Sequence, residues 1–488
     1  MNMDNEQWIY IRKIFQEIWG YEDFRHPQKE IIQCLLTGED SLIIMPTGAG
    51  KSLCFQLPAL LKKGLTIVIS PLVALMENQV NELKIKQFPV ELLHNEITRK
   101  ERKKTLNKIN KQEIRLLYLS PETLLSPPVW EVLIQPHIEI NGLILDEAHC
   151  LVQWGETFRP AYNRLGAVRK ALLVNKPPDK KMAIAAFTAT ADVKSQSIIK
   201  QVLGLKNYQK FCLSPYRNNL NLNIKIAWTP RCRQHQLLNF IKSQQKESGL
   251  IYVRSRRDSE KLSQWLSNLN YKVGAYHAGL SSLERREIEN KWLQEKLQFV
   301  VCTSAFGLGI NKANVRWVVH FQAPFLLSEY LQEIGRGGRD GKTTKTLTLI
   351  SEPTGWLDPS DRQKNDYFLQ QLQQKYQKAK NYFKMIPQQG NIQSIIQEIP
   401  QVDITLSLLN RWGKLEWIDP FNYKLKSDIS SINFTEMKKI SQQESQQMKQ
   451  YLMTRSCRWQ YLLKAFGFSQ EARGFKCGHC DNCYRQKD

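Results

Sequence analysis

The sequence has no run of about 18 apolar residues, the length that a helix needs to cross a bilayer. Its first ten residues, MNMDNEQWIY, are acidic and do not show the basic-then-apolar order of a signal peptide. No segment repeats at a period of roughly 20 to 50 residues. These absences argue against membrane partners, secretion and a solenoid, and they predict a cytoplasmic protein, associated with the nucleoid if the source is bacterial.

Acidic residues are few relative to basic ones. The chain has 46 Asp and Glu against 69 Lys and Arg, which gives a formal charge of +23. Such a charge attracts polyanions and favours salt-sensitive phosphate binding, although many basic proteins bind no nucleic acid. With 42% hydrophobic and 24% charged residues in 488, the composition is that of a folded protein of roughly three domains.

Two series of short, β-rich apolar segments alternate with helical segments, as in parallel sheets with crossover helices. The first series runs from about Ser41 to Leu205 and the second from about residue 249 to 351. We therefore predict an α/β protein with two parallel-sheet domains, 1–207 and 208–352, joined near residues 206–215. After Glu352 the alternation of strand-like and helical segments ends. We expect a mostly α C-terminal region at 353–488, beginning with a Gln-rich helix.

Residues 391–425 are typical of a winged helix. The order is a helix, Pro400, a second helix ending at Trp412 and Gly413, and a hairpin around the turn DPFN. One hypothesis is that this segment grips duplex DNA through Phe421, Tyr423 and Lys424. The alternative is a spacer that supports a metal module.

A phosphate-binding loop is predicted after the strand at 41–45, where PTGAGKS leads into a helical pattern. Backbone N–H groups of a glycine-rich loop at a helix N-terminus can surround phosphate oxygens. Lys51 would reach the β and γ phosphates, and Ser52 would ligate Mg²⁺. The strict pattern has a glycine where Met45 stands. The ATP-binding residues of the loop are Thr47, Gly48, Ala49, Gly50, Lys51 and Ser52.

A pair of acids follows the apolar strand at 142–145, in the sequence DEAH. Asp146 would hold Mg²⁺ through water, and Glu147 would polarise the water that attacks the γ-phosphate. Adjacent acids are common on surfaces, but a preceding phosphate loop favours the catalytic interpretation. His149 is expected to link this site to the strand Phe187–Thr190.

Positive charge for the transition state is offered by QEIGRGGRDG, which places Arg336 and Arg339 at a helical spacing of three. The alternative is a solvated basic turn. If the arginines act on the nucleotide, ATP would close a cleft between the two domains.

The last four cysteines are clustered. In a reducing compartment the C-x2-C-x2-C arrangement indicates a metal site, and four thiolates suit a closed tetrahedral Zn²⁺ site. The predicted zinc module, 457–483, has the ligands Cys457, Cys477, Cys480 and Cys483.

Eight strings together resemble the RecQ family of superfamily two helicases: FRHPQKEII, MPTGAGKSLCFQLPAL, VISPLVALMENQV, LILDEAHC, FTATA, YHAGL, AFGLGINK and QEIGRGGRDG. The resemblance covers essentially residues 10–350. It implies RecA-like domains, ATP, DNA unwinding with 3′–5′ polarity, and roles in recombination and repair. By likeness, Gln28 reads the adenine with support from Arg25, Arg339 is the arginine finger, and Arg336 is the second arginine of its motif.

The run CLVQWGETFRPAY, directly after the acidic box, most separates this family from other DEAD and DEAH proteins. Trp154, Phe158 and Arg159 would stack on bases and hold phosphate. The family uses this loop to signal DNA occupancy to the ATP site. Core packing is the alternative for Trp154.

The expected partners are single-stranded and forked duplex DNA, with protein partners unknown. The expected activity is an ATP-dependent DNA helicase. Alternatives are an RNA helicase, a translocase without strand separation, and a non-catalytic nucleic-acid-binding protein. The family's usual winged helix follows the zinc module, whereas here the winged-helix-like segment precedes Cys457, so strand-separating power is less firmly implied than ATP hydrolysis.

Overall fold

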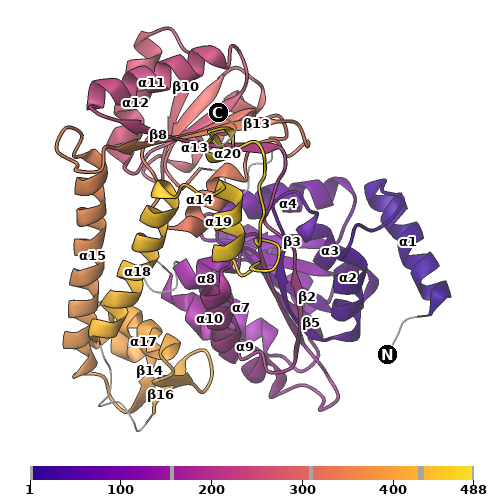
Figure 1. Cartoon of the computed structure of the whole chain (residues 1–488). Helices are drawn as coiled ribbons and strands as arrows, with labels where there is room; N and C mark the ends of the chain where they lie inside the picture. The colour runs from indigo at the N-terminus through magenta and orange to yellow at the C-terminus, as the bar shows by residue number, and fades with distance from the viewer. Residues whose placement is uncertain (1–3, 154–158, 307–311, 427–433, 486–488) are drawn as a thin grey trace. The chain divides into compact units, whose positions relative to one another are not determined.

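The protein is described by a computed structural model that covers residues 4–153, 159–306, 312–426 and 434–485. The chain forms two compact units that do not follow chain order (Figure 1). The first unit comprises Met1–Leu213 and Lys378–Ile432, and the second comprises Ser214–Gln377 and Asn433–Asp488. The predicted C-terminal region, 353–488, is therefore divided between the two units.

The first unit is built on a seven-stranded sheet with the order β3-β4-β2-β5-β6-β1-β7, and all its pairings are parallel. Its strands are β1 Asp40–Ile44, β2 Leu65–Ile69, β3 Val90–Leu93, β4 Leu116–Leu119, β5 Ile140–Leu145, β6 Ala183–Thr188 and β7 Tyr208–Cys212. Strand β7 pairs with β1, so the first sheet continues past residue 207, where the sequence placed the end of this domain.

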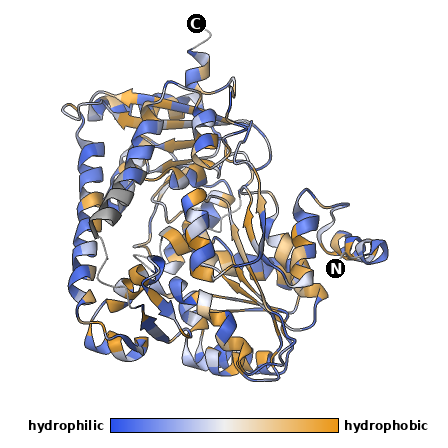
Figure 2. Cartoon of the chain, turned by 60° about the horizontal axis from the view of Figure 1, so that its bottom comes forward, coloured by the Kyte–Doolittle hydropathy of each residue, from blue (hydrophilic) through white to orange (hydrophobic). Residues whose placement is uncertain are grey.

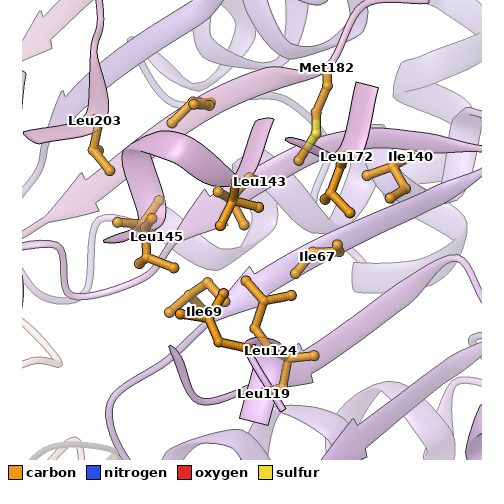
Figure 3. Packing of buried hydrophobic residues seen from close by; sticks show 14 of the residues in the cluster. Ile67, Ile69, Leu119, Leu124, Ile140, Leu143, Leu145, Leu172, Met182 and Leu203 are labelled. Carbon is orange, nitrogen blue, oxygen red and sulfur yellow. The ribbon is translucent and has the colours of Figure 1, made fainter. Parts of the chain in front are cut away.

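Both faces of this sheet are buried because its strands are apolar at successive positions. Ile67 and Ile69 of β2 belong to one apolar cluster, with Leu143 and Leu145 of β5 (Figure 3). Val68, between the first two, belongs to the cluster on the opposite face. The alternation follows from the period of two of a β-strand.

Helices cover the two faces separately. Helices α2 to α4 contribute to the cluster that contains Val68, and α5 to α10 contribute to the cluster that contains Ile67. The helical segments of the first sheet domain are α1 Asn5–Trp19, α2 Gln28–Thr37, α3 Lys51–Leu61, α4 Val73–Ile85, α5 Arg99–Asn110, α6 Pro121–Leu124, α7 Pro127–Leu133, α8 His149–Gln153, η1 Pro160–Arg164, α9 Leu165–Leu173 and α10 Val193–Leu203.

The second unit contains a six-stranded sheet with the order β10-β11-β9-β12-β13-β8, also parallel throughout. Its strands are β8 Leu220–Ala227, β9 Gly249–Tyr252, β10 Val273–Tyr276, β11 Phe299–Cys302, β12 Trp317–His320 and β13 Thr344–Ser351. Its helices are α11 Pro230–Ser243, α12 Arg256–Asn268, α13 Ser282–Leu293, α14 Leu327–Ile334, most of α15 Ser360–Phe383, α18 Phe434–Met453, α19 Arg458–Ala465 and α20 Asp481–Tyr484. The two predicted parallel sheets are thus confirmed.

Residues 389–426, which we call the wing module, form a small β-α-α-β-β unit in the first compact unit. Its antiparallel sheet has the order β14-β16-β15. Its elements are β14 Gln389–Asn391, α16 Ile392–Glu398, α17 Val402–Arg411, β15 Leu415–Trp417 and β16 Asn422–Leu425. The two helices and the hairpin predicted for 391–425 are confirmed, and β14 was not predicted.

The predicted Gln-rich helix is α15, Ser360–Phe383. Figure 2 shows it as mostly hydrophilic, in contrast to the strands of the large sheets. Phe368 of α15 is anchored by stacking on Phe325, with ring centroids 4.3 Å apart. Among the residues that the structure describes, no helix combines the length and the apolar character needed to cross a membrane.

Candidate nucleotide site and metal centre

The loop between β1 and α3 has the backbone geometry of a phosphate cradle. Gly48 and Gly50 have φ values of +87° and +78°, in the left-handed region that favours glycine. Helix α3 begins at Lys51, so its first N–H groups face this loop. The Nζ atom of Lys51 is buried and has no hydrogen-bond partner among the described residues. A phosphate oxygen would supply the missing partner.

Gln28 closes one side of the loop. Its Nε2 atom donates to the carbonyl oxygen of Ala49 at 3.1 Å, and its Oε1 atom accepts from the backbone N–H of Arg25 at 2.9 Å. A Cβ atom on Gly50 would lie 2.4 Å from Gln28 Nε2, so only glycine leaves room for this contact. The structure therefore brings Gln28 and Arg25 to the predicted phosphate loop.

The acidic pair lies beyond the carboxyl end of β5, in reach of the same loop. The Oε1 atom of Glu147 lies 3.7 Å from Lys51 Nζ, and the two side chains are only 14% and 9% exposed. Glu147 has a φ of +52°, a strained value for a residue with a side chain. In this conformation the Glu147 carboxylate lies beside the phosphate loop.

Burial raises the pKa of Asp146, and the neighbouring charge of Glu147 raises it further. Lys51 acts in the opposite direction, as do hydrogen bonds from Gln79 and from the backbone N–H of Glu147. Gln79 Nε2 donates to Asp146 Oδ2 at 3.2 Å. A buried carboxylate beside a second acid is suited to holding a cation. Gln79 was not singled out from the sequence, although it lies in one of the strings that resemble the family.

His149 makes the predicted link to the strand at 187–190. Its Nδ1 atom lies 3.2 Å from Thr188 Oγ1 and 3.3 Å from Glu147 Oε2. Thr188 ends β6 and also contacts the backbone of Thr190. The prediction for His149 is therefore confirmed, and Glu147 is connected to two neighbouring strands.

Arg336 and Arg339 lie in the second unit, directly after α14. Arg336 is 8% exposed. One turn earlier, Glu333 binds Arg254 at 2.9 Å and His320 at 3.0 Å. This buried network holds the end of α14, from which the two arginines follow. Their action on a nucleotide remains a prediction.

Trp154 and Phe158 lie outside the described residues. Arg159 is described: its Nη1 atom lies 3.9 Å from Glu122 Oε2, and its side chain is 20% exposed. The three residues remain candidates for nucleic-acid contact.

The predicted contact of Tyr423 with duplex DNA is wrong, because the Tyr423 side chain is fully buried in the core of the wing module. Phe421 is partly buried, and its ring packs edge-on against Trp130 of α7, with centroids 5.3 Å apart. Lys424 is exposed. Contact of Phe421 and Lys424 with duplex DNA stays a prediction.

The four clustered cysteines meet in the second unit. The Sγ atoms of Cys457, Cys477, Cys480 and Cys483 all lie within 4.8 Å of one another. Tetrahedral coordination with Zn–S bonds of about 2.3 Å requires sulfur atoms about 3.8 Å apart, and the Cys477 and Cys483 sulfurs are 3.9 Å apart. The residues fit Zn²⁺.

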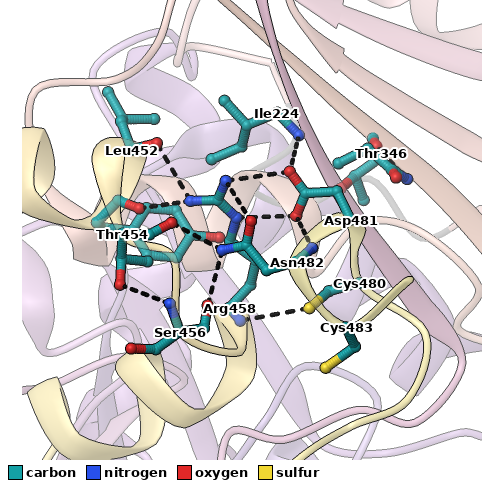
Figure 4. A network of polar contacts seen from close by, with 12 residues as sticks. Ile224, Thr346, Leu452, Thr454, Ser456, Arg458, Cys480, Asp481, Asn482 and Cys483 are labelled. Carbon is teal, nitrogen blue, oxygen red and sulfur yellow. Dashed lines mark hydrogen bonds and ion pairs between the residues drawn. The ribbon is translucent and has the colours of Figure 1, made fainter. Parts of the chain in front are cut away.

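A buried polar network ties this centre to edge strand β8 (Figure 4). Arg458 pairs with Asp481 at 2.9 Å, and Asp481 accepts from the backbone N–H of Ile224 at 3.1 Å. Trp459 donates its indole N–H to the carbonyl oxygen of Leu220 at 3.3 Å. The module thereby covers part of an otherwise unpaired strand edge. The sequence pattern predicted the metal site but not this attachment.

Three family models match the chain. The DEAD/DEAH box helicase model covers residues 25–198, and the helicase conserved C-terminal domain covers 232–341. The RecQ zinc-binding model covers 424–484. The first includes the phosphate loop and the acidic pair, and the third includes the four cysteines.

The ATP-dependent DNA helicase RecQ of Synechocystis is 49% identical over 473 residues, which cover 97% of this chain and 98% of the relative. The chain belongs to the RecQ family. The RecQ helicase of Haemophilus influenzae is 38% identical over 70% of this chain, and the match spans about half, 54%, of that relative. The match to the first relative therefore extends over nearly the whole of both chains.

Solved structures show the same helicase fold. Dbp5 of Saccharomyces cerevisiae, bound to RNA and ADP BeF3, gives a TM-score of 0.58 at 15% identity and covers 72% of this chain and 90% of its own. The Mycobacterium smegmatis helicase Lhr, bound to single-stranded DNA and AMP-PNP, gives 0.58 at 17% identity over 86% of this chain and 60% of its own. At such identities the likeness of these proteins to this chain concerns the fold alone.

We predict that Lys51→Ala lowers the turnover number for ATP by about 100-fold or more, because it removes a preorganised charge from the phosphate site. Steady-state hydrolysis measures the effect. Lys63→Ala, an exposed lysine just beyond α3, is the matched control and should retain full turnover. Near-normal turnover of Lys51→Ala would show that the nucleotide site lies elsewhere.

Cys480→Ser should lower the zinc content and reduce the free energy of unfolding by about 2 kcal/mol or more, because it removes a ligand from a structural site. Metal analysis and denaturant unfolding provide the measurements. Cys232→Ser, outside the cluster, should change neither quantity. Stable wild-type protein without zinc would contradict the metal assignment.

Proposed function

We propose that the chain is an ATP-dependent DNA helicase that moves along one strand in the 3′–5′ direction and separates duplex DNA in recombination and repair. The observation that carries the proposal is the cluster of Lys51, Glu147 and His149 at one phosphate loop. The identity of 49% over nearly the whole length to a protein named an ATP-dependent DNA helicase supports it.

Ser52 and Asp146 would hold Mg²⁺, which would supply positive charge to the phosphates. Lys51 would clamp the β and γ phosphates. Glu147 would accept a proton from the attacking water at a carboxylate oxygen. Gln28, with Arg25, would hold the adenine.

Arg336 and Arg339 would supply positive charge to the transition state. They belong to the second unit, whereas the phosphate loop belongs to the first. Hydrolysis would therefore depend on the closure of the two domains, and closure and reopening would drive the steps along the strand.

DNA contact is assigned to Trp154, Phe158 and Arg159, which would stack on bases and hold phosphate. The formal charge of +23 favours binding to a phosphate backbone. Single-stranded DNA should therefore stimulate hydrolysis, and forked duplex should be the substrate for unwinding. RNA is the less favoured substrate, because the relative that is 49% identical over nearly the whole chain is named a DNA helicase.

The test is an unwinding assay with Mg²⁺ and ATP on three substrates: DNA with a 3′ tail, DNA with a 5′ tail, and an RNA duplex. We expect strand separation of the 3′-tailed DNA at a rate at least about tenfold above that of the other two, a discrimination worth about 1.4 kcal/mol. Lys51→Ala is the control for contaminating helicase. Preference for the RNA duplex, or hydrolysis without unwinding of any substrate, would contradict the proposal.

A further inference from the structure

Helix α17 of the wing module contacts the chain on both sides of the aromatic run at residues 153–159. Arg411 Nη1 donates to the carbonyl oxygen of Val152 at 2.9 Å. Ser407 Oγ donates to the carbonyl oxygen of Pro160 at 3.2 Å. Both contacts lie within the first compact unit. One helix from the C-terminal part of the chain therefore holds the two residues that flank the run, Val152 and Pro160.

The position of α17 on the first sheet domain is fixed by burial. Ser407 is 1% exposed and Leu406 is fully buried. Ala167 of α9 belongs to the same apolar cluster as Leu406. From α10, Gln201 Nε2 donates to the carbonyl oxygen of Arg411 at 3.0 Å. Apolar packing and the hydrogen bond from Gln201 thus hold α17, the helix that contacts Val152 and Pro160.

The hairpin of the wing module attaches at a second point. Arg164 Nη1, at the end of η1, donates to the carbonyl oxygen of Pro420 at 3.3 Å. The ring of Phe421 packs against Trp130 of α7. Because the module is attached through both α17 and the hairpin, it cannot pivot freely about α17.

The contact at Val152 is close to the catalytic carboxylate. Val152 lies in α8, a five-residue helix that begins at His149. At a rise of about 1.5 Å per residue, the two residues are only about 5 Å apart along the helix axis. His149 in turn contacts Glu147 and Thr188. A displacement at Val152 would therefore reach Glu147 through a single short helix.

We infer that Ser407 and Arg411 are positioning residues that hold Val152 and Pro160, which flank the aromatic run, and thereby determine how strongly single-stranded DNA stimulates ATP hydrolysis. This role rests on the proposed function, because it requires a DNA-stimulated ATPase. The contacts described for Ser407 and Arg411 are with Pro160, Val152 and Gln201, not with residues of the phosphate loop. The competing explanation is that α17 only anchors the wing module.

The test measures ATP hydrolysis against the concentration of oligothymidylate for Ser407→Ala, Arg411→Ala and the double variant. Loss of these hydrogen bonds should raise the concentration that gives half-maximal stimulation by about three- to tenfold in the double variant, with basal turnover and the KM for ATP within about twofold. Arg411→Lys keeps a cationic donor and should restore part of the effect.

Two controls separate positioning from stability. Gln388→Ala removes a hydrogen bond to the Leu425 carbonyl oxygen inside the wing module, away from the run. Ser445→Ala removes a buried hydroxyl of α18 that bonds to Asn365. Both should leave stimulation unchanged. Unchanged half-saturation in the double variant, an equal effect in Gln388→Ala, or a parallel loss of basal and stimulated rates would overturn the inference.

If oligothymidylate does not stimulate the wild-type protein, the proposed function fails, but the positioning role of Ser407 and Arg411 is still open. Hydrogen exchange then tests that role directly. Residues 149–161 of the unliganded double variant should exchange faster than the same residues of Gln388→Ala, while residues 47–52 exchange equally in both. Equal exchange at residues 149–161 would overturn the positioning role.

Discussion

The nucleotide site depends on the parallel packing of three neighbouring strands, β5, β6 and β1. Parallel strands end at the same edge of a sheet, so the segments that follow them meet there. The phosphate loop follows β1, the acidic pair follows β5, and Thr188 ends β6. The distance of 3.7 Å between Lys51 and Glu147 and the contact of His149 with Thr188 are consequences of this strand order.

The chain passes back and forth between the two units, so the predicted site residues are divided between them. The boundaries follow Leu213, Gln377 and Ile432, so the chain passes between the units three times. The phosphate loop and the wing module belong to the first unit, and the two arginines and the zinc centre belong to the second. The wing module is joined on both sides to segments of the second unit, while its buried face packs on the first sheet domain. The C-terminal part of the chain therefore supports both sheets.

Local chemistry was predictable from the sequence, and long-range partners were not. A glycine-rich loop before a helix, two acids after an apolar strand, and closely spaced cysteines can each be recognised from a few neighbouring residues. The sequence alone was therefore enough to predict a role for each of them. Gln79 carries no such signal, because its importance comes only from the distant Asp146. Tyr423 was misassigned because an aromatic residue in a hairpin can face solvent or a core, and here it faces the core of the wing module. The attachment of the zinc centre to β8 likewise depends on tertiary packing.

The most direct test of the account concerns Glu147, the predicted catalytic base, which contacts Lys51 and His149. Glu147→Gln should bind ATP with the affinity of the wild-type protein, since the amide keeps the volume of the carboxylate, but should hydrolyse it about 100-fold more slowly or worse and unwind no DNA. Glu113→Gln, an exposed position in the same unit, is the matched control. The measurement is single-turnover hydrolysis of ATP in the presence of 3′-tailed DNA. The account predicts that Glu147→Gln holds bound, intact ATP. Rapid hydrolysis or unwinding by Glu147→Gln would contradict it.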